Sequence, residues 1–365
     1  MDGLAEPSTA GLRGDIAAAR AAERARLLSP VGRRRWLRIA GLGVLAAGLA
    51  AAVLLSLAVG ARPIPLGVVL EALTAFDAAD TLHLVVHDLR LPRTMVGIAV
   101  GLALSVAGAL MQAITRNPLA DPGLLGVNSG ASLAAVIAIW VLHVTSLGAL
   151  VWFALAGAGT IAVLVYLLGS LGRGGATPVR LALAGAAINA LLFALVSAVL
   201  LLSKETLDIY RFWIVGSLTG AAGIVLRDLL PFLAGGLALA LIAGRSLNAV
   251  ALGDDTARAL GTRLGLTRVV TMMAITLLCG AAVAAAGPIG FIGLVVPHLA
   301  RAWCGGDQRW LIAYSAILGP IVLVLSDVAG RVVLPPGEVQ VGIMTALIGG
   351  PLFVGIVRNI RLAQL

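Results

Sequence analysis

Long apolar runs, separated by short segments that carry arginine, glycine and proline, make up most of this chain. A helix needs about 20 apolar residues to cross a bilayer. β-barrel strands would instead read as short alternating segments. The pattern therefore predicts an all-α, polytopic membrane protein with about ten transmembrane helices. We expect them near residues 37–59, 95–115, 128–147, 149–169, 181–202, 229–244, 269–286, 290–303, 310–327 and 341–357.

The arginines indicate how these helices are oriented. If both chain ends lie on one side, the loops on that side carry about 19 of the 26 basic residues. Cytoplasmic loops are enriched in lysine and arginine, so both termini are predicted to be cytoplasmic. Residues 1–36 are then a cytoplasmic extension, 37–360 the transmembrane domain and 361–365 a cytoplasmic tail.

Composition supports a lipid environment. Hydrophobic residues make up 60% of the chain and charged residues 12%, whereas soluble domains carry about 25% charged residues. The mean hydropathy is +1.05. The net charge of +9 does not indicate nucleic-acid binding, because the arginines fall between apolar runs. Cys279 and Cys304 lie in or beside such runs and are interpreted as packing residues.

Several kinds of chemistry are missing from the sequence. Lys204 is the sole lysine and follows Leu-Leu-Ser, so no phosphate-binding Gly-rich loop ending in Lys is present. His83 and His87 are interpreted as residues of a solvated external loop rather than as metal ligands. Ion-coupled carriers bury ionisable relays in their helices, and here Asp327 and His298 are the candidates. This scarcity suggests that a partner protein supplies the energy.

Three segments stand out against the apolar background. Arg90-Leu-Pro-Arg93 sits at the expected outer mouth of a helix, and Arg331 follows another expected helix end; alone, these side chains could simply reach the headgroups. The stretch 117–126 breaks helix geometry repeatedly, and irregular backbone at membrane depth is tolerated only inside protein or along a water-filled cavity. It is interpreted as a pore-lining turn.

The third segment, residues 252–265, is predicted to hold a short helix in a cytoplasmic loop. Gly253 and Gly261 bracket it, and Asp254 and Asp255 favour its positive N-terminal end. Such a helix suits a docking element, although an ordinary capped loop explains the same residues.

Together with Gly-Pro-Ile-Gly-Phe-Ile-Gly-Leu-Val-Val-Pro-His at 287–298, these segments resemble the FecCD family of ABC importer permeases over roughly residues 40–360. The resemblance implies a permease in the bacterial inner membrane, paired with a second permease subunit that is identical or paralogous. It also implies two cytoplasmic ATPase subunits and an external substrate-binding protein. ATP and Mg would bind the ATPases, so this chain would be neither an enzyme nor a cofactor carrier.

The resemblance also implies roles for particular residues. The arginines Arg90, Arg93 and Arg331 would face acidic residues of the binding protein. An inner gate would include Asn117 and Leu119, with a weaker match at Thr177. The coupling loop that docks in the ATPase would comprise Gly253, Asp254, Asp255, Thr256, Ala257, Arg258, Leu260 and Gly261. The chain departs from the family pattern in Glu338-Val-Gln-Val-Gly, where Gln340 replaces a usual proline, and in Asp307-Gln-Arg.

The function expected from this resemblance is import of ferric siderophores by alternating access, driven by the partner ATPases. Cobalamin or haem remains open as the substrate within the family. From other classes, an ion-coupled secondary carrier and a non-transporting membrane scaffold remain as alternatives.

Overall fold

The computed structural model describes residues 30–60, 62–171, 178–219, 224–335 and 337–362. Its principal helices are α2 (Pro30–Ala58), α5 (Leu91–Thr115), α6 (Val127–Leu142), α7 (Leu147–Ser170), α8 (Pro178–Leu202), α10 (Ile224–Val250), α12 (Leu264–Ala286), α13 (Ile292–Cys304), α14 (Gln308–Val333) and α15 (Val341–Leu362). The short elements are α3 (Leu66–Thr74), α4 (Thr81–Leu84), the π-helical η1 (Val85–Arg90), the 3₁₀-helical η2 (Pro122–Leu125), α9 (Lys204–Ile214) and α11 (Asp254–Ala259).

The all-α prediction is confirmed, because these residues form helices and no strand. Each predicted apolar run overlaps one of the principal helices. Seven helical segments are long and apolar enough to cross a membrane, and three shorter apolar helices lie at Val127–Leu142, Ile292–Cys304 and Val341–Gly355. The number of membrane crossings and the proposed domain boundaries stay predictions.

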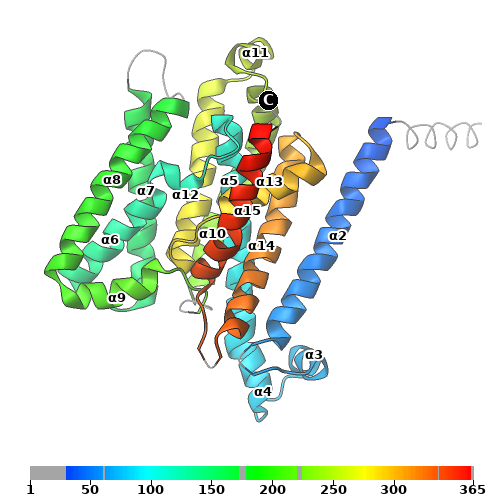
Figure 1. Ribbon diagram of the computed structural model, residues 1–365, viewed down its shortest axis with the longest axis vertical. Coiled ribbons are helices and arrows are strands. Elements are labelled where there is room, and N and C mark those ends of the chain that lie inside the picture. Colours follow the sequence, from blue (N-terminus) through cyan, green and yellow to red (C-terminus); the bar gives the residue numbers. More distant parts are fainter. Residues whose placement is uncertain (1–29, 61, 172–177, 220–223, 336, 363–365) are drawn as a thin grey trace, which may run out of the picture.

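The bundle has two ends, which we name after the short helices that lie there (Figure 1). At the α11 end, α2 begins and α15 ends. At the α4 end lie α3 and α4, with α9 on the same side of the bundle. The first and last described residues therefore lie at the same end of the bundle. Which end of the bundle faces the cytoplasm stays a prediction.

Helix α5 forms the centre of the bundle and packs against α12, α13 and α14. Small residues make these approaches close. A side-chain carbon at Gly108 would lie 1.8 Å from the carbonyl oxygen of Gly293, and one at Gly101 would lie 2.8 Å from that of Gly319. Glycine in membrane helices permits such backbone contact. Glycines therefore lie at the points where α5 crosses α13 and α14, and they allow the helix backbones to touch.

Replacing Gly108 with alanine should destabilise the bundle. The added methyl group must push α5 away from α13, and overpacking a tight contact costs about 1–3 kcal/mol. The matched control is Gly43→Ala in α2, where the same methyl group meets no atom within 4 Å. Thermal unfolding of the purified protein in detergent should show a midpoint several degrees lower for G108A than for G43A. Equal midpoints would contradict the close crossing.

Two helix boundaries correct the sequence prediction. Arg90 and Arg93 were expected at the mouth before a helix, but α4, η1 and α5 form one helical segment from Thr81 to Thr115. Pro92 falls in the first turn of α5, where a missing N–H is tolerated. Arg331 was expected after a helix end, but α14 continues to Val333. Polarity near residue 327 was misread as a helix end, because the partners of these charges are not visible in the sequence.

The predicted solvated loop around the two histidines is also wrong, because both lie in helical elements and one of them is buried. His83 lies on α4 with 3% of its surface exposed, and its Nδ1 accepts a hydrogen bond from the backbone N–H of Asp77 at 3.1 Å. His87 is exposed and lies beside Asp88. No cluster of three potential metal ligands occurs in the described part of the chain. Both cysteines are buried and free, as packing residues should be.

Candidate functional site

A network of buried charges occupies the α4 end of the bundle. Asp327 in α14 accepts two hydrogen bonds from Arg93 in α5, from Nε at 3.0 Å and from Nη2 at 2.8 Å. It also pairs with Arg331 one turn further along α14, whose Nε lies 3.0 Å away. Arg93 reaches Glu338 with its remaining nitrogen, 2.7 Å from Oε2. One carboxylate thus holds two guanidinium groups from different helices.

The same network extends to α2. Arg331 donates from Nη1 to the carbonyl oxygen of Ser56 at 2.8 Å and from Nη2 to its hydroxyl at 3.0 Å. The Ser56 hydroxyl lies 2.7 Å from that of Thr94. Arg90 binds differently, because it donates to the backbone carbonyls of Leu57, at 2.7 Å, and Arg62. The three arginines therefore tie α2, α5 and α14 together.

The arginines predicted to contact a partner are thus largely occupied within the chain. Arg90 is 8% and Arg331 3% exposed, and the Arg93 side chain is 12% exposed. Their role in docking stays a prediction, and it is weakest for Arg331, since contact there would require breaking its pair with Asp327. Sequence reasoning missed the counter-ions. One signal was available, because Asp327 and Arg331 are four residues apart, the spacing at which helical side chains meet.

A turn is present where one was predicted, at the α11 end of α5; that it lines a pore stays a prediction. The chain leaves the helix at Arg116, whose φ is 51°, and re-enters helix after the single turn of η2. The Asn117 side chain accepts a hydrogen bond from the N–H of Leu119 at 2.9 Å, and Leu119 is 40% exposed. A local side-chain hydrogen bond therefore fixes the turn, and the apolar side chain of Leu119 is exposed on it. Thr177 lies outside the described residues.

Asp121 begins η2 and anchors this turn. Its carboxylate accepts from the N–H of Gly123 at 2.8 Å, and desolvation raises its pKa, an effect that this hydrogen bond opposes. Asn189 of α8 donates to the Gly123 carbonyl at 3.2 Å. A side-chain carbon at Gly185 would lie 1.7 Å from the carbonyl oxygen of Leu124. Helix α8 therefore rests directly on the turn.

The short helix predicted between Gly253 and Gly261 is confirmed as α11. Both glycines have positive φ, 101° and 79°, a conformation that side chains disfavour. Ala257 is fully buried against Val250 and Leu264, whereas Leu260 is 63% exposed. One face of α11 therefore packs against the ends of α10 and α12, while the apolar side chain of Leu260 is exposed.

Asp254 links α11 to the rest of the bundle. It accepts from Arg116 at 3.1 Å and from Arg268 of α12 at 2.7 Å. Arg116 immediately precedes Asn117, so the α11 helix is bonded to the residue at which the turn begins. The remaining pair, Arg258 with Asp255, is exposed and lies within α11. Asp254 is therefore the residue that connects the two segments.

The segment Asp307-Gln-Arg departs from the pattern expected for the family, but Asp307 has a defined local role. It caps α14 by accepting from the N–H of Arg309 at 3.0 Å and receives a bond from Asn248 of α10 at 2.9 Å. Burial would raise the pKa of Asp307, but these hydrogen bonds and the Arg309 charge outweigh it, so the pKa is lowered. The carboxylate clamps the ends of α10 and α14 beside α11.

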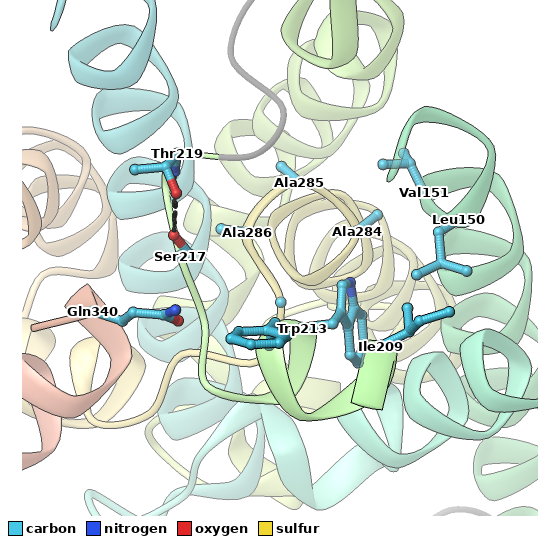
Figure 2. A pocket seen from close by; sticks show the side chains of 12 residues that line it. Leu150, Val151, Ile209, Trp213, Ser217, Thr219, Ala284, Ala285, Ala286 and Gln340 are labelled. Atoms are coloured by element: carbon cyan, nitrogen blue, oxygen red, sulfur yellow. Dashed lines mark hydrogen bonds between the residues drawn. The ribbon is translucent and has the colours of Figure 1, made fainter. Parts of the chain in front are cut away.

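A cavity of about 260 Å³ lies between α7, α9 and the end of α12 (Figure 2). Trp213, Ile209 and Leu150 form part of an apolar wall. Ser217 and Thr219, whose hydroxyls lie 2.7 Å apart, and Gln340 supply polar groups. Pockets for drug-sized molecules span about 300–1,000 Å³, so this cavity is too small to enclose a large chelate.

The motifs therefore fall into three groups: the charges at the α4 end, the turn after α5, and the partly exposed helix α11, which is bonded to Arg116 beside that turn. The FecCD transport family matches residues 48–359 of the chain. The chain belongs to the FecCD transport family. Its members form the permease component of ABC importers and are not themselves catalytic.

Relatives of this FecCD chain include two named iron-complex permeases. The ferric enterobactin transport system permease protein FepD of Escherichia coli (strain K12) is 46% identical over 307 residues, which cover 84% of this chain and 91% of FepD. The iron(3+)-hydroxamate import system permease protein FhuB of Bacillus subtilis (strain 168) is 42% identical over 323 residues, 88% of this chain and 83% of FhuB.

A solved structure described as an inward-facing conformation of a metal-chelate type ABC transporter has a similar fold. It superposes with a TM-score of 0.75 at 27% identity and covers 87% of this chain and 98% of its own. The helix arrangement of this chain is thus similar to that of the solved transporter.

Proposed function

We propose that this chain is the permease subunit of an ABC importer that carries ferric siderophores across the bacterial inner membrane. Two observations together carry the proposal: family membership, and the position of α11. Leu260 is exposed on α11, and Asp254 bonds α11 to Arg116, the residue before the turn at Asn117. An ATPase that moves α11 would also act on that turn. The substrate class is supported by the iron-complex permeases among the relatives.

In this mechanism two cytoplasmic ATPase subunits bind ATP and Mg, close, and shift α11 of each permease subunit. Asn117, Leu119 and Thr177 would gate the inner end of a path formed with the second permease subunit. A substrate-binding protein would dock at the α4 end, on the arginine network. The α11 end is then cytoplasmic, together with both chain termini.

The alternative of an ion-coupled carrier has little support from the buried charges. Asp327 is the buried carboxylate that such a carrier would use, but it is bonded to two arginines. A proton relay through this carboxylate would need to break both ion pairs. The scaffold alternative predicts no transport at all. Co-purification of an ATPase that depends on residues 252–265 would exclude both.

Uptake of radiolabelled ferric siderophore by iron-limited host cells tests the substrate. Deleting this chain should abolish energy-dependent uptake, and the intact chain should restore it. The same cells are tested with radiolabelled haem and cobalamin. Loss of haem or cobalamin uptake with unchanged iron uptake would overturn the ferric-siderophore assignment within the family.

A further inference from the structure

The two acidic members of the arginine network differ in how firmly they are held. Asp327 has 2% of its side chain exposed and bonds Arg93 and Arg331 together. Glu338 has 37% exposed and contacts Arg93 alone, through Nη1. Asp327 is therefore built into the helix bundle, whereas Glu338 reaches Arg93 from the protein surface.

The backbone beside Glu338 is fixed, although its side chain is not enclosed. The N–H of Val339 donates to the carbonyl oxygen of Gly330 in α14 at 2.9 Å. A glutamate side chain has several rotatable bonds and loses entropy when it is held in one geometry. Its carboxylate can therefore leave Arg93 without moving the chain that carries it.

The charges of this cluster do not cancel. Arg90, Arg93 and Arg331 face two carboxylates among the described residues of the network, and Arg90 is bonded to neutral carbonyls. If the Glu338 side chain rotates away, Arg93 still bonds Asp327, but its Nη1 loses its hydrogen-bond partner. The geometry thus leaves one guanidinium position that an outside carboxylate can occupy.

We propose that Glu338 is an exchangeable internal counter-ion, which holds Arg93 in the free permease and gives way to an acidic side chain of the docking binding protein. This rests on the docking of a binding protein at the α4 end in the proposed function. Glu338 then competes with the partner for Arg93 and weakens docking. Exposed ion pairs contribute little, so the exchange is readily reversible.

The experiment measures the affinity of the transporter's own substrate-binding protein for the assembled importer in lipid nanodiscs. Glu338→Gln should bind about three- to fivefold more tightly at low salt, because no internal pair must be broken. The gain should shrink at high ionic strength. Glu205→Gln is the matched control, since it removes one exposed carboxylate from α9, on the same side of the bundle.

A double-mutant cycle with Arg93→Gln tests whether the effect passes through Arg93. E338Q should change nothing in the R93Q background. A gain that persists there, an equal gain in E205Q, or no gain in E338Q would each overturn the proposal. If R93Q does not fold, the comparison of E338Q with E205Q decides alone. Absence of binding by the wild type would instead overturn docking itself.

Discussion

Replacing Asp254 with asparagine is expected to uncouple this importer. The substitution keeps the shape of the side chain but removes the charge that Arg116 and Arg268 share. Helix α11 would then be seated by Ala257 alone, and its movement would no longer be passed to the turn at Asn117. We expect ATP-driven uptake to fall about tenfold, a coupling free energy of ~1.4 kcal/mol.

Uptake and ATP hydrolysis, measured together in proteoliposomes that contain the whole importer, check this expectation. Hydrolysis should continue while uptake falls. Arg116→Gln should act in the same direction, because it removes the other partner of the bond between α11 and the turn, while Arg268 still anchors Asp254 to α12. The control is Asp208→Ala, which breaks an exposed pair with Arg211 on α9. Full uptake by D254N would exclude the link between α11 and the turn.

Replacing Asp327 with asparagine is expected to destabilise the folded permease more than the loss of any exposed carboxylate. Arg93 and Arg331 would both lose their shared carboxylate while remaining buried among α2, α5 and α14. Removing one partner of a buried ion pair costs about 3–5 kcal/mol, because an uncompensated charge is left in the interior. Thermal unfolding in detergent should show the midpoint falling by about 10 °C.

Two further variants distinguish the effect of an unpaired buried charge from a general loss of stability. Asp327→Leu combined with Arg331→Met removes the pair within α14 and should recover part of the lost stability, since apolar replacement of a buried pair is often tolerated. Glu338→Gln removes a carboxylate from the same network at its exposed edge and should change stability by less than about 1 kcal/mol. Equal unfolding temperatures for D327N and E338Q would show that the buried ion pairs do not stabilise the α4 end of the bundle.

Much of the architecture could be predicted from local pattern. Apolar runs formed helices because a backbone in lipid must satisfy its hydrogen bonds within the segment. The break at 117–126 and the glycines around α11 were also readable, since proline and positive-φ glycine act through the backbone of neighbouring residues. These features need no knowledge of the rest of the chain.

Apart from α11, the short helices between the principal helices were not predicted. Helix α9 packs Tyr210 and Trp213 inward, and α3 buries Val69 and Ala72. Both are too short to stand out as apolar runs. Isolated short helices are marginal in water, so these depend on the surface of the bundle against which they pack.

What the sequence alone determined is the helical membrane architecture, the broken turn and the presented helix, because each depends on residues close together in the chain. Only the tertiary structure decided which charged side chains are buried and which partners they bind. Arg93 and Asp327 are 234 residues apart, and whether they meet depends on how α5 and α14 are rotated and packed. Arg93 would read as a free cation in any local window, and its burial with a carboxylate shared with Arg331 follows from helix packing.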